Sequence, residues 1–379
     1  MDYLLTEEQI MLKDMVSKFS KEKIAPVASD NEKNHRYPAD IIAEAGELGL
    51  MGIAYPTEYG GAGMDFMSYF LTVEEVSRWC ASTGVIISAH SSLVCDPIFR
   101  FGTEEQKMKY LPDLLSGKKI GSFSLTEAGA GSDSGATKTT AVLDGDEWVL
   151  NGSKIFATNG KEAEIFVLVA STAPGQKTRG VSAFIVESNT PGYSIGKVEK
   201  KMGIRSSSTT EIILDNCRIP KENLLGELNK GFKISMITLD GGRIGIASQA
   251  LGIARACIED SIKYANERQQ FDVPISSFQA IQWMIADMWV EYESAWLLVY
   301  RASLLKDKKV NYSREAAMAK LKASEVAMDC ARKAIQIHGG YGFTEDFNVE
   351  RYYRDAKITE LYEGTSEIQR MVIARSLLG

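Results

Sequence analysis

Three carboxylates lie close together near the C-terminus, in the string Glu360-Leu361-Tyr362-Glu363-Gly364-Thr365-Ser366-Glu367. Acids at the start of a helix usually interact with its dipole and its free N–H groups. A catalytic carboxylate would instead have to be desolvated against a ligand, so that its pKa rises towards neutrality and it can accept a proton. The string alone leaves both interpretations open.

A glycine-rich string, Glu127-Ala128-Gly129-Ala130-Gly131-Ser132-Asp133-Ser134-Gly135, partly matches a dinucleotide-binding fingerprint. Its third glycine comes one residue late, and no strand–helix–strand unit surrounds it. The backbone N–H groups and the hydroxyls of Thr126, Ser132 and Ser134 could still meet a phosphate or the edge of a flavin ring. Taken alone, the string is read more simply as a surface turn.

Two further patterns predict no chemistry. Gly192-Tyr193-Ser194-Ile195-Gly196 matches the nucleophile elbow of serine hydrolases as a string, but a Pro191-Gly192 turn precedes it and His338 is the only later histidine. The three histidines, His35, His90 and His338, do not have the sequence spacing of metal ligands, so we predict no metal site.

The elements that position these residues change in character along the chain. Residues 6–119 have a helical pattern, with capping boxes at Thr6-x-x-Gln9 and Thr103-x-x-Gln106. Residues 120–227 are β-rich, and Asp144-Gly145 indicates a hairpin. The predicted strands include residues 142–143, 147–150, 165–170, 181–186 and 209–214.

Helical periodicity returns after residue 231. Residues 244–266, 279–305 and 314–338 carry apolar or small residues at three-to-four spacing, Gly339-Gly340 stops the last of them, and a final helix begins near Ser366. Helices and strands are segregated, which predicts an α+β protein rather than a doubly wound sheet. We predict three domains: helical over 1–119, β over 120–230 and helical over 231–379.

Composition narrows the function classes. The chain has 379 residues, 45% hydrophobic and 25% charged, with a formal net charge of −7 that argues against nucleic acid as a partner. No stretch approaches the ~18 apolar residues of a membrane span, and the N-terminus has no signal-peptide pattern. Five scattered cysteines indicate a reduced, cytosol-like compartment rather than a disulfide framework.

Several ordered strings together resemble the acyl-CoA dehydrogenase family over residues 5–379, and most of all its bacterial short-chain, butyryl-CoA-type members. The strings are Ser124-Leu125-Thr126-Glu127-x-x-Ala130-Gly131-Ser132-Asp133, Leu150-Asn151-Gly152-x-Lys154 with 155–159, Leu239-Asp240-Gly241-Gly242-Arg243, Tyr264-Ala265-x-x-Arg268, Gln336-Ile337-His338-Gly339-Gly340, and residues 358–369.

The resemblance implies an N-terminal helical domain, a central β-barrel-like domain and a C-terminal four-helix bundle, with non-covalent FAD between the last two. It also implies the cofactor contacts. The flavin and its phosphates would meet Phe123, Leu125, Thr126 and Ser132, and the isoalloxazine ring Phe156, Ala157 and Thr158. The adenylate half would meet Arg268, Gln279, Gln336, Ile337, Gly339 and Gly340, partly across a subunit boundary, and Thr365, Ser366 and Glu367 would complete the site.

By the same resemblance, Glu363 is the catalytic base. It would remove the α-proton of an acyl-CoA thioester while a hydride leaves the β-carbon for flavin N5, giving a trans-2-enoyl-CoA. Some relatives carry the base on the helix of Asp240 to Arg243, where this chain has Gly242. Asp240 and Arg243 would contact the adenosine end of CoA, and Ser132, Tyr362 and Gly364 would also bind the substrate.

Asp96 departs from the short-chain pattern, in which a small or neutral residue is usual at the floor of the acyl cavity. It could point aside and bond a helix end. Alternatively, it could lie in the pocket and act as a base on an alicyclic substrate, such as cyclohexane- or cyclohexene-carbonyl-CoA. Residues 82–96 contain no arginine to receive a glutaryl carboxylate, which disfavours decarboxylating glutaryl-CoA chemistry.

The resemblance further implies an electron-transfer flavoprotein as electron acceptor, a homotetramer built as a dimer of dimers, and a bacterial cytoplasmic location. Two alternatives from other classes stay open. One is a non-catalytic flavoprotein subunit, and the other is the serine hydrolase suggested by residues 192–196.

Overall fold

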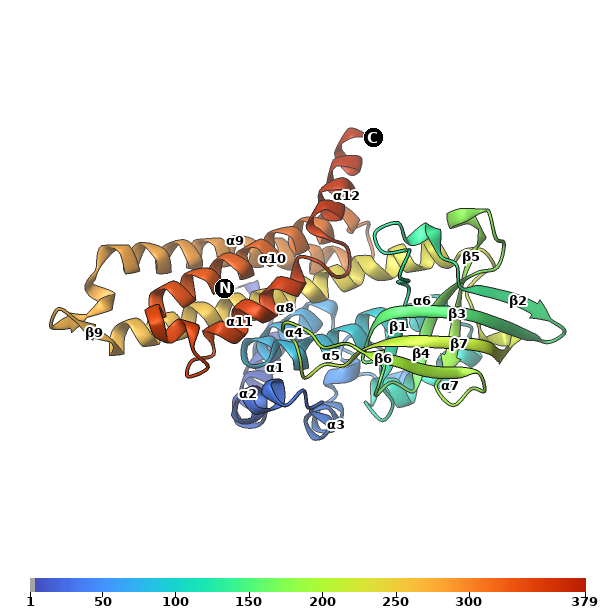
Figure 1. The fold of residues 1–379 in the computed structure, drawn as a ribbon, viewed down its shortest axis with the longest axis horizontal. Coiled ribbons are helices and arrows are strands. Elements are labelled where there is room, and N and C mark those ends of the chain that lie inside the picture. The colour runs from blue at the N-terminus through green and yellow to red at the C-terminus, as the bar shows by residue number, and fades with distance from the viewer. Residues whose placement is uncertain (1–3) are drawn as a thin grey trace.

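The computed structural model describes residues 4–379, so Met1 to Tyr3 of the N-terminal pattern lie outside the described residues. Helices fill the first third of the chain, a sheet the middle, and long helices the last third (Figure 1). This α+β order confirms the predicted architecture. The N-terminal helices are α1 (Glu7–Phe19), α2 (Ala25–Lys33), α3 (Ala39–Glu47), α4 (Phe66–Trp79), α5 (Ala81–Ala89), α6 (Asp96–Phe101) and α7 (Glu104–Leu115).

Both predicted capping boxes are present. The Thr6 hydroxyl accepts from the Gln9 backbone N–H at 3.2 Å, and the Gln9 side-chain oxygen accepts from the Thr6 N–H at 3.0 Å. Thr103 and Gln106 form the same reciprocal pair at 3.3 and 3.0 Å. Each box satisfies two N–H groups that the first turn of a helix leaves free.

Within residues 4–379 eight strands form one mixed sheet in the order β6-β7-β3-β2-β4-β5-β8, with β1 beside β4, and two short strands later in the chain form a separate hairpin. β4 is buried at every position, which is typical of a strand covered on both faces. The strands are β1 (Gly121–Ser124), β2 (Thr140–Asp144), β3 (Glu147–Thr158), β4 (Ile165–Ser171), β5 (Val181–Glu187), β6 (Tyr193–Val198), β7 (Thr209–Pro220) and β8 (Leu224–Leu225).

The hairpin predicted at Asp144-Gly145 joins β2 to β3, where Asp144 pairs with Glu147 and Gly145 has a φ of 64°. The nucleophile-elbow string lies almost entirely in β6, with Ser194 opposite Ile213 of β7. A serine inside a strand lacks the strand-to-helix turn that a nucleophile elbow needs, which removes the support for a serine hydrolase.

The C-terminal third is built on α8 (Gly231–Glu267), a helix about 55 Å long at 1.5 Å per residue. It runs from the sheet to the hairpin of β9 (Gln269–Gln270) and β10 (Val273–Pro274), and it lies between α4 and α10 (Ser313–His338) (Figure 1). A Cβ at Gly252 would lie 2.5 Å from the Glu74 carbonyl oxygen, so this glycine lets α4 and α8 approach closely. The other elements are α9 (Gln279–Asp307), α11 (Val349–Thr359) and α12 (Ser366–Leu378).

The predicted helix 244–266 begins thirteen residues too late, because α8 starts at Gly231. Gly241 and Gly242 precede the predicted helix and disfavour helix formation locally, yet both are buried within α8. Tertiary packing has overridden the low helix propensity of glycine there. Among the described residues, no helix is long and apolar enough to span a membrane.

Candidate active site

Glu363 lies on a tight turn between α11 and α12. Its φ is 54° and that of Gly364 is 96°, so two consecutive residues occupy the left-handed region. A non-glycine residue held there stores about 1–3 kcal/mol of strain, which the surrounding structure must offset. Such over-determined conformations cluster at functional sites.

Hydrogen bonds from three helices hold this turn. The Gly364 carbonyl accepts from Lys320 Nζ of α10 at 2.8 Å and from Gln369 Nε2 of α12 at 2.7 Å. Gln369 Nε2 also lies 3.2 Å from the Glu363 carbonyl. The Tyr362 hydroxyl donates to Gln249 Oε1 of α8. Three helices therefore fix the backbone that carries Glu363.

The Glu363 carboxyl group is desolvated. The residue as a whole is half-buried, but its Oε2 atom is shielded from solvent and has no hydrogen-bond partner within the described chain. Burial raises the pKa of Glu363 to about 8, although the charges of Lys320 and Arg243 act to lower it. A carboxylate poised near neutrality is suited to accept a proton from a weak carbon acid.

Gly242 of α8 faces this carboxyl group. A Cβ at Gly242 would lie 2.0 Å from Glu363 Oε2 and 2.7 Å from Leu93 Cδ2. The absence of a side chain on α8 therefore makes room for the Glu363 carboxyl group, and Glu363 is the acid at this point of the site.

The three clustered acids prove to be in different environments. Glu360 forms an ion pair with Lys357 at 2.6 Å. Glu367 is exposed in the first turn of α12, where backbone N–H donation lowers its pKa. The helix-terminus interpretation therefore holds for Glu367, whereas Glu363 meets the condition for a base. Thr365 caps α12 by accepting from the Ile368 N–H at 3.4 Å.

Asp96 is buried and paired. One carboxylate oxygen, Oδ1, accepts from Lys306 Nζ of α9 at 3.1 Å, and the other, Oδ2, lies 3.6 Å from Arg100 without a hydrogen bond. Lys306 Nζ also lies 3.8 Å from the centre of the Phe66 ring. Asp96 thus points at a lysine from a distant helix rather than at a helix end.

Glu363 and Asp96 share neighbours. A Cβ at Gly241 would lie 2.7 Å from Lys306 Nζ, so the Asp96 pair and Glu363 face adjacent residues of α8. Burial raises the pKa of the Tyr69 phenol, and the carboxylates of Glu363 and Asp96 both add to that rise. Both acids therefore lie within electrostatic range of the same phenol group.

Asp240 and Arg243 form an ion pair at 2.5 Å, and Ser313 Oγ donates to Asp240 at 2.9 Å. The Arg243 side chain is buried, its Nε has no partner within residues 4–379, and its charge reaches Glu363. Contact of Asp240 and Arg243 with the CoA adenosine end stays a prediction.

The glycine-rich string forms the loop between β1 and β2. The buried Lys154 Nζ anchors its start by donating to Glu127 Oε1 at 2.7 Å and to the Leu125 carbonyl at 3.1 Å. Glu127 also accepts from the N–H groups of Lys138 and Thr139 at 2.8 and 3.0 Å. Both ends of the loop are thus tied to one buried ion pair.

The features of this loop fit a flavin. Phe156 of β3 has a φ of 59° and is 58% exposed, so a large aromatic ring is held open to a partner. The Ser124 hydroxyl is buried without a partner within the described residues, and a Cβ at Gly129 would meet nothing within 4 Å. The other predicted flavin contacts are half-buried Phe123, Leu125, Thr126 and Thr158, exposed Ser132 and buried Ala157.

The predicted adenylate contacts gather at the C-terminal end of α8. Arg268 follows α8 and its guanidinium lies 5.8 Å from the Tyr341 ring centre, next to the Gly339-Gly340 turn that ends α10. Arg268, Gln279, Gln336, Gly339 and Gly340 are exposed, whereas Ile337 is buried. Arg268 lies about 39 Å along α8 from Gly242, at 1.5 Å per residue.

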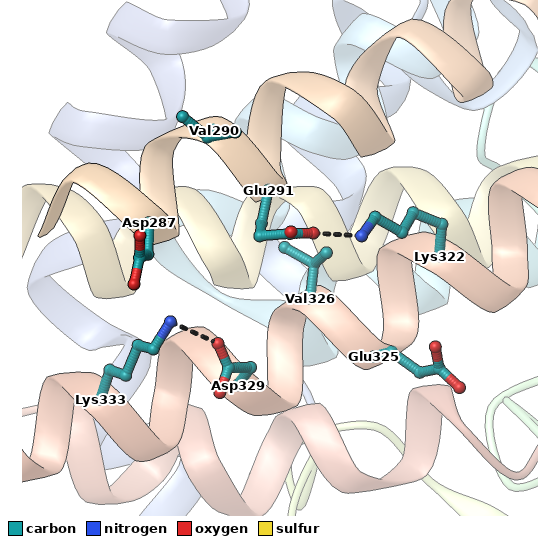
Figure 2. Close-up of a pocket in the computed structure, with 8 residues that line it drawn as sticks. All are labelled: Asp287, Val290, Glu291, Lys322, Glu325, Val326, Asp329 and Lys333. Carbon is teal, nitrogen blue, oxygen red and sulfur yellow. Dashed lines mark hydrogen bonds and ion pairs between the residues drawn. The ribbon is translucent and has the colours of Figure 1, made fainter. Parts of the chain in front are cut away.

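A separate hollow of about 370 Å³ lies between α9 and α10 (Figure 2). Figure 2 shows its charges in pairs: Glu291 of α9 with Lys322 of α10 across the hollow, and Asp329 with Lys333 along α10. None of its side chains is a buried polar group without a partner in the described chain, so it lacks the features of an active site. Its lining residues are Asp287, Val290, Glu291, Lys322, Glu325, Val326, Asp329 and Lys333.

Comparison with known proteins identifies the family. The models for the N-terminal, middle and C-terminal domains of acyl-CoA dehydrogenase match residues 6–118, 122–217 and 229–378. The chain is 52% identical over 374 residues to the short-chain specific acyl-CoA dehydrogenase of Clostridium acetobutylicum, covering 99% of each protein. This chain is a member of the acyl-CoA dehydrogenase family.

Solved structures of this acyl-CoA dehydrogenase fold agree. Butyryl-CoA dehydrogenase from Megasphaera elsdenii superposes with a TM-score of 0.98 at 44% identity, with full coverage of both chains. A chain from a structure of the electron transferring flavoprotein of Acidaminococcus fermentans also gives 0.98, at 52% identity and full coverage. The chain is accordingly a flavin-dependent oxidoreductase of the acyl-CoA dehydrogenase class.

Sequence reasoning missed several residues of this acyl-CoA dehydrogenase site. Lys320, Gln369 and Gln249 fix the turn of Glu363, and Lys306 pairs with Asp96. The available signal was weak: Lys320 occupies a position in a predicted helix where the three-to-four spacing calls for an apolar residue. No group of three or more His, Cys, Asp or Glu residues that could hold a metal occurs among the described residues.

Proposed function

We propose that the chain catalyses the FAD-dependent α,β-dehydrogenation of a short-chain acyl-CoA thioester, with Glu363 as the base. The observation that carries this proposal is the Glu363 carboxyl group, which is shielded, unpartnered and held on a left-handed turn opposite Gly242. The short-chain substrate follows from the relatives, which share about half of their residues with this chain over its whole length.

In this reaction Glu363 accepts the α-proton of the thioester. The surrounding burial keeps water from competing for the carboxylate, and the charges of Lys320 and Arg243 oppose the cost of ionising it. Bound FAD would supply the acceptor for the β-hydride. Phe123, Leu125, Thr126, Ser132 and residues 156–158 would hold the flavin beside the substrate. Thr365, Ser366 and Glu367 would close the site at the start of α12.

The cofactor site would be shared between two chains. Within one chain, the adenylate-side residue Arg268 lies about 39 Å along α8 from Gly242, which faces the Glu363 carboxyl group. The resemblance to the family implies that the adenylate contacts lie partly across a subunit boundary, so the flavin contacts and the adenylate contacts of one chain would each hold half of a different FAD. A dimer, and a homotetramer built from two dimers, would bring complementary halves together.

The exposed face of α9 supports this assembly. Trp283, Val290 and Leu297 recur every seven residues and are 61%, 62% and 46% exposed. A stripe of this kind is typical of a helix that packs against another helix. Val290 also lines the hollow of Figure 2, so the stripe and the hollow lie on one face that a second copy would cover.

A second candidate substrate is an alicyclic acyl-CoA such as cyclohexane- or cyclohexene-carbonyl-CoA. It is favoured by one observation: Asp96 is buried within electrostatic range of the Tyr69 phenol, as Glu363 is, with one oxygen free of hydrogen bonds in the described structure. The neighbouring cation, Lys306, is already paired with Asp96, which leaves it poorly placed to receive a glutaryl carboxylate.

Electrons would leave by way of an electron-transfer flavoprotein. The similarity to a chain from a structure of the electron transferring flavoprotein of Acidaminococcus fermentans supports this partner. A non-catalytic flavoprotein subunit is the competing proposal, and it predicts a yellow protein that no acyl-CoA bleaches.

The test is anaerobic bleaching of the bound flavin by a panel of linear and alicyclic acyl-CoA thioesters. We expect butyryl-CoA to bleach the flavin of the wild-type protein and to leave the flavin of the Glu363→Gln variant unbleached. Glu360→Gln is the matched control, because that acid is paired on the same turn but faces Lys357. Bleaching of Glu363→Gln at the wild-type rate would overturn the assignment of the base.

The same panel separates the substrates. If Asp96 acts on an alicyclic ring, Asp96→Gly loses activity on the alicyclic thioesters and keeps it on butyryl-CoA. An unchanged substrate profile would end the role of Asp96 in the pocket.

A further inference from the structure

Lys320 is a buried lysine with no carboxylate ion pair in the described structure. Its side chain is 0% exposed in the middle of α10. Its ammonium group donates a hydrogen bond to the backbone carbonyl of Gly364 at 2.8 Å. Burying an ammonium group costs several kcal/mol unless neighbouring groups compensate. An apolar side chain of similar length would fill this space without that cost, so the cost points to a role.

The position of Lys320 relative to the base is specific. Glu363 and Gly364 are adjacent on the same left-handed turn, so the bonded carbonyl belongs to the residue next to the base. Gln369 Nε2 donates to the same oxygen at 2.7 Å. The Gly364 carbonyl oxygen therefore accepts two hydrogen bonds of similar length, one from the charged Lys320 ammonium group and one from the neutral Gln369 amide.

The charges around Lys320 come from α8, from the segment that joins α11 to α12 and from the first turn of α12. Burial lowers the pKa of Lys320 to about 8, Glu363 opposes this most strongly, and Arg243 of α8 adds to the lowering. Glu360 after α11 and Glu367 of α12 act as further negative neighbours. In return, Lys320 is the foremost charge that lowers the pKa of Glu363, ahead of Arg243. The phenol groups of Tyr69 and Tyr362 also face Glu363, and burial keeps both neutral.

We propose that Lys320 is a positioning residue for this reaction: its ammonium group fixes the Gly364 carbonyl next to the base and supplies the positive charge that lets Glu363 ionise inside the site. This inference rests on the proposed role of Glu363. It assigns to Lys320 a function that hydrogen bonding alone, as in Gln369, does not provide.

The experiment measures the rate of flavin bleaching by butyryl-CoA at limiting substrate, from pH 6 to pH 9.5, in FAD-loaded full-length protein. For the wild type we expect a rate that rises with pH through about 8. In Lys320→Gln the rise should move up by about one pH unit, because a nearby opposite charge is worth about 1–3 units. The rate should then fall about tenfold at pH 7 and recover at high pH.

Two variants separate charge from hydrogen bonding. Gln369→Met removes the neutral donor to the same carbonyl, so its rate should fall at all pH values without a shift of the profile. Lys320→Arg keeps a charge that does not titrate below pH ~12, so its profile should rise at or below the wild-type pH. This variant also decides the question if Lys320→Gln does not fold, since a rise above the wild-type pH would overturn the proposal.

The outcomes distinguish the two proposals. If Glu363→Gln bleaches normally, the assignment of the base fails, whatever Lys320 does. If Glu363→Gln is inactive while Lys320→Gln keeps the wild-type profile, the base stands and the role of Lys320 is refuted. An equal shift in Gln369→Met would show that geometry, and not charge, sets the profile, which also refutes it.

Discussion

Gly242→Ala tests the placement of the base by adding one methyl group. The new Cβ would lie 2.0 Å from Glu363 Oε2, whereas an ordinary contact begins at 3.4 Å, so the carboxyl group must retreat by about 1.4 Å. Because Oε2 is the end of a flexible side chain, the retreat costs little. A misplacement of about 1 Å in a reacting group can cost about a hundredfold in rate.

The effect on stability should be small by comparison. Alanine is favoured over glycine inside a helix by about 1 kcal/mol. Crowding of Leu93 Cδ2, 2.7 Å from the new atom, opposes this by about 1–3 kcal/mol. We therefore expect a net change within about 2 kcal/mol, a melting temperature within a few degrees of wild type, and full FAD content.

The assay is stopped-flow bleaching of the flavin by butyryl-CoA, with thermal unfolding of the same preparations. The expected result is about a hundredfold loss of rate in a stable, yellow protein. Bleaching within twofold of wild type would refute the reasoning, since it would show that Glu363 does not act from the position opposite Gly242. A large loss of stability would mean that Oε2 cannot move, which would also contradict the argument.

Two other predictions concern the base and the flavin loop. Burial raises the pKa of Glu363 to about 8, and a base must be ionised to act. The value of kcat/KM should therefore fall about tenfold for each pH unit below that pKa. A flat pH profile between pH 6 and 8 in steady-state assays would contradict this prediction. Lys154→Met leaves Glu127 buried without its cation and frees the Leu125 carbonyl, which should cost about 3–5 kcal/mol and weaken FAD retention. Urea unfolding and the flavin absorbance after gel filtration measure both effects, and wild-type values for both would show that the pair does not anchor the loop.

Local patterns in the sequence were sufficient to predict much of the fold. Capping boxes at Thr6 and Thr103 and the Asp144-Gly145 hairpin depend on residues within a few positions of one another, and each forms as predicted. The first turns of α8 could not be predicted in this way. Gly241 and Gly242 favour a loop locally, and only their packing against Lys306 and Glu363 explains a helix there.

The polar parts of the site depend on contacts far apart in the sequence. Lys320 bonds a carbonyl 44 residues away, and Lys306 bonds Asp96 across 210 residues. The three-to-four spacing places both lysines on the apolar faces of their helices, but it does not reveal which groups they meet. Their burial follows from the meeting of α10 with the turn before α12 and of α9 with α6, which no local pattern encodes.

The length of α8 has a consequence for how subunits can rescue one another. If each cofactor is held by the sheet end of one chain and the hairpin end of another, a variant damaged near Thr126 and a variant damaged near Arg268 are each inactive as homo-oligomers. Co-assembled, they form some sites from two undamaged halves, together with others that combine both lesions. Activity would then depend on which chains assemble together, so a lesion in a single copy acts on its neighbour's cofactor as well as its own.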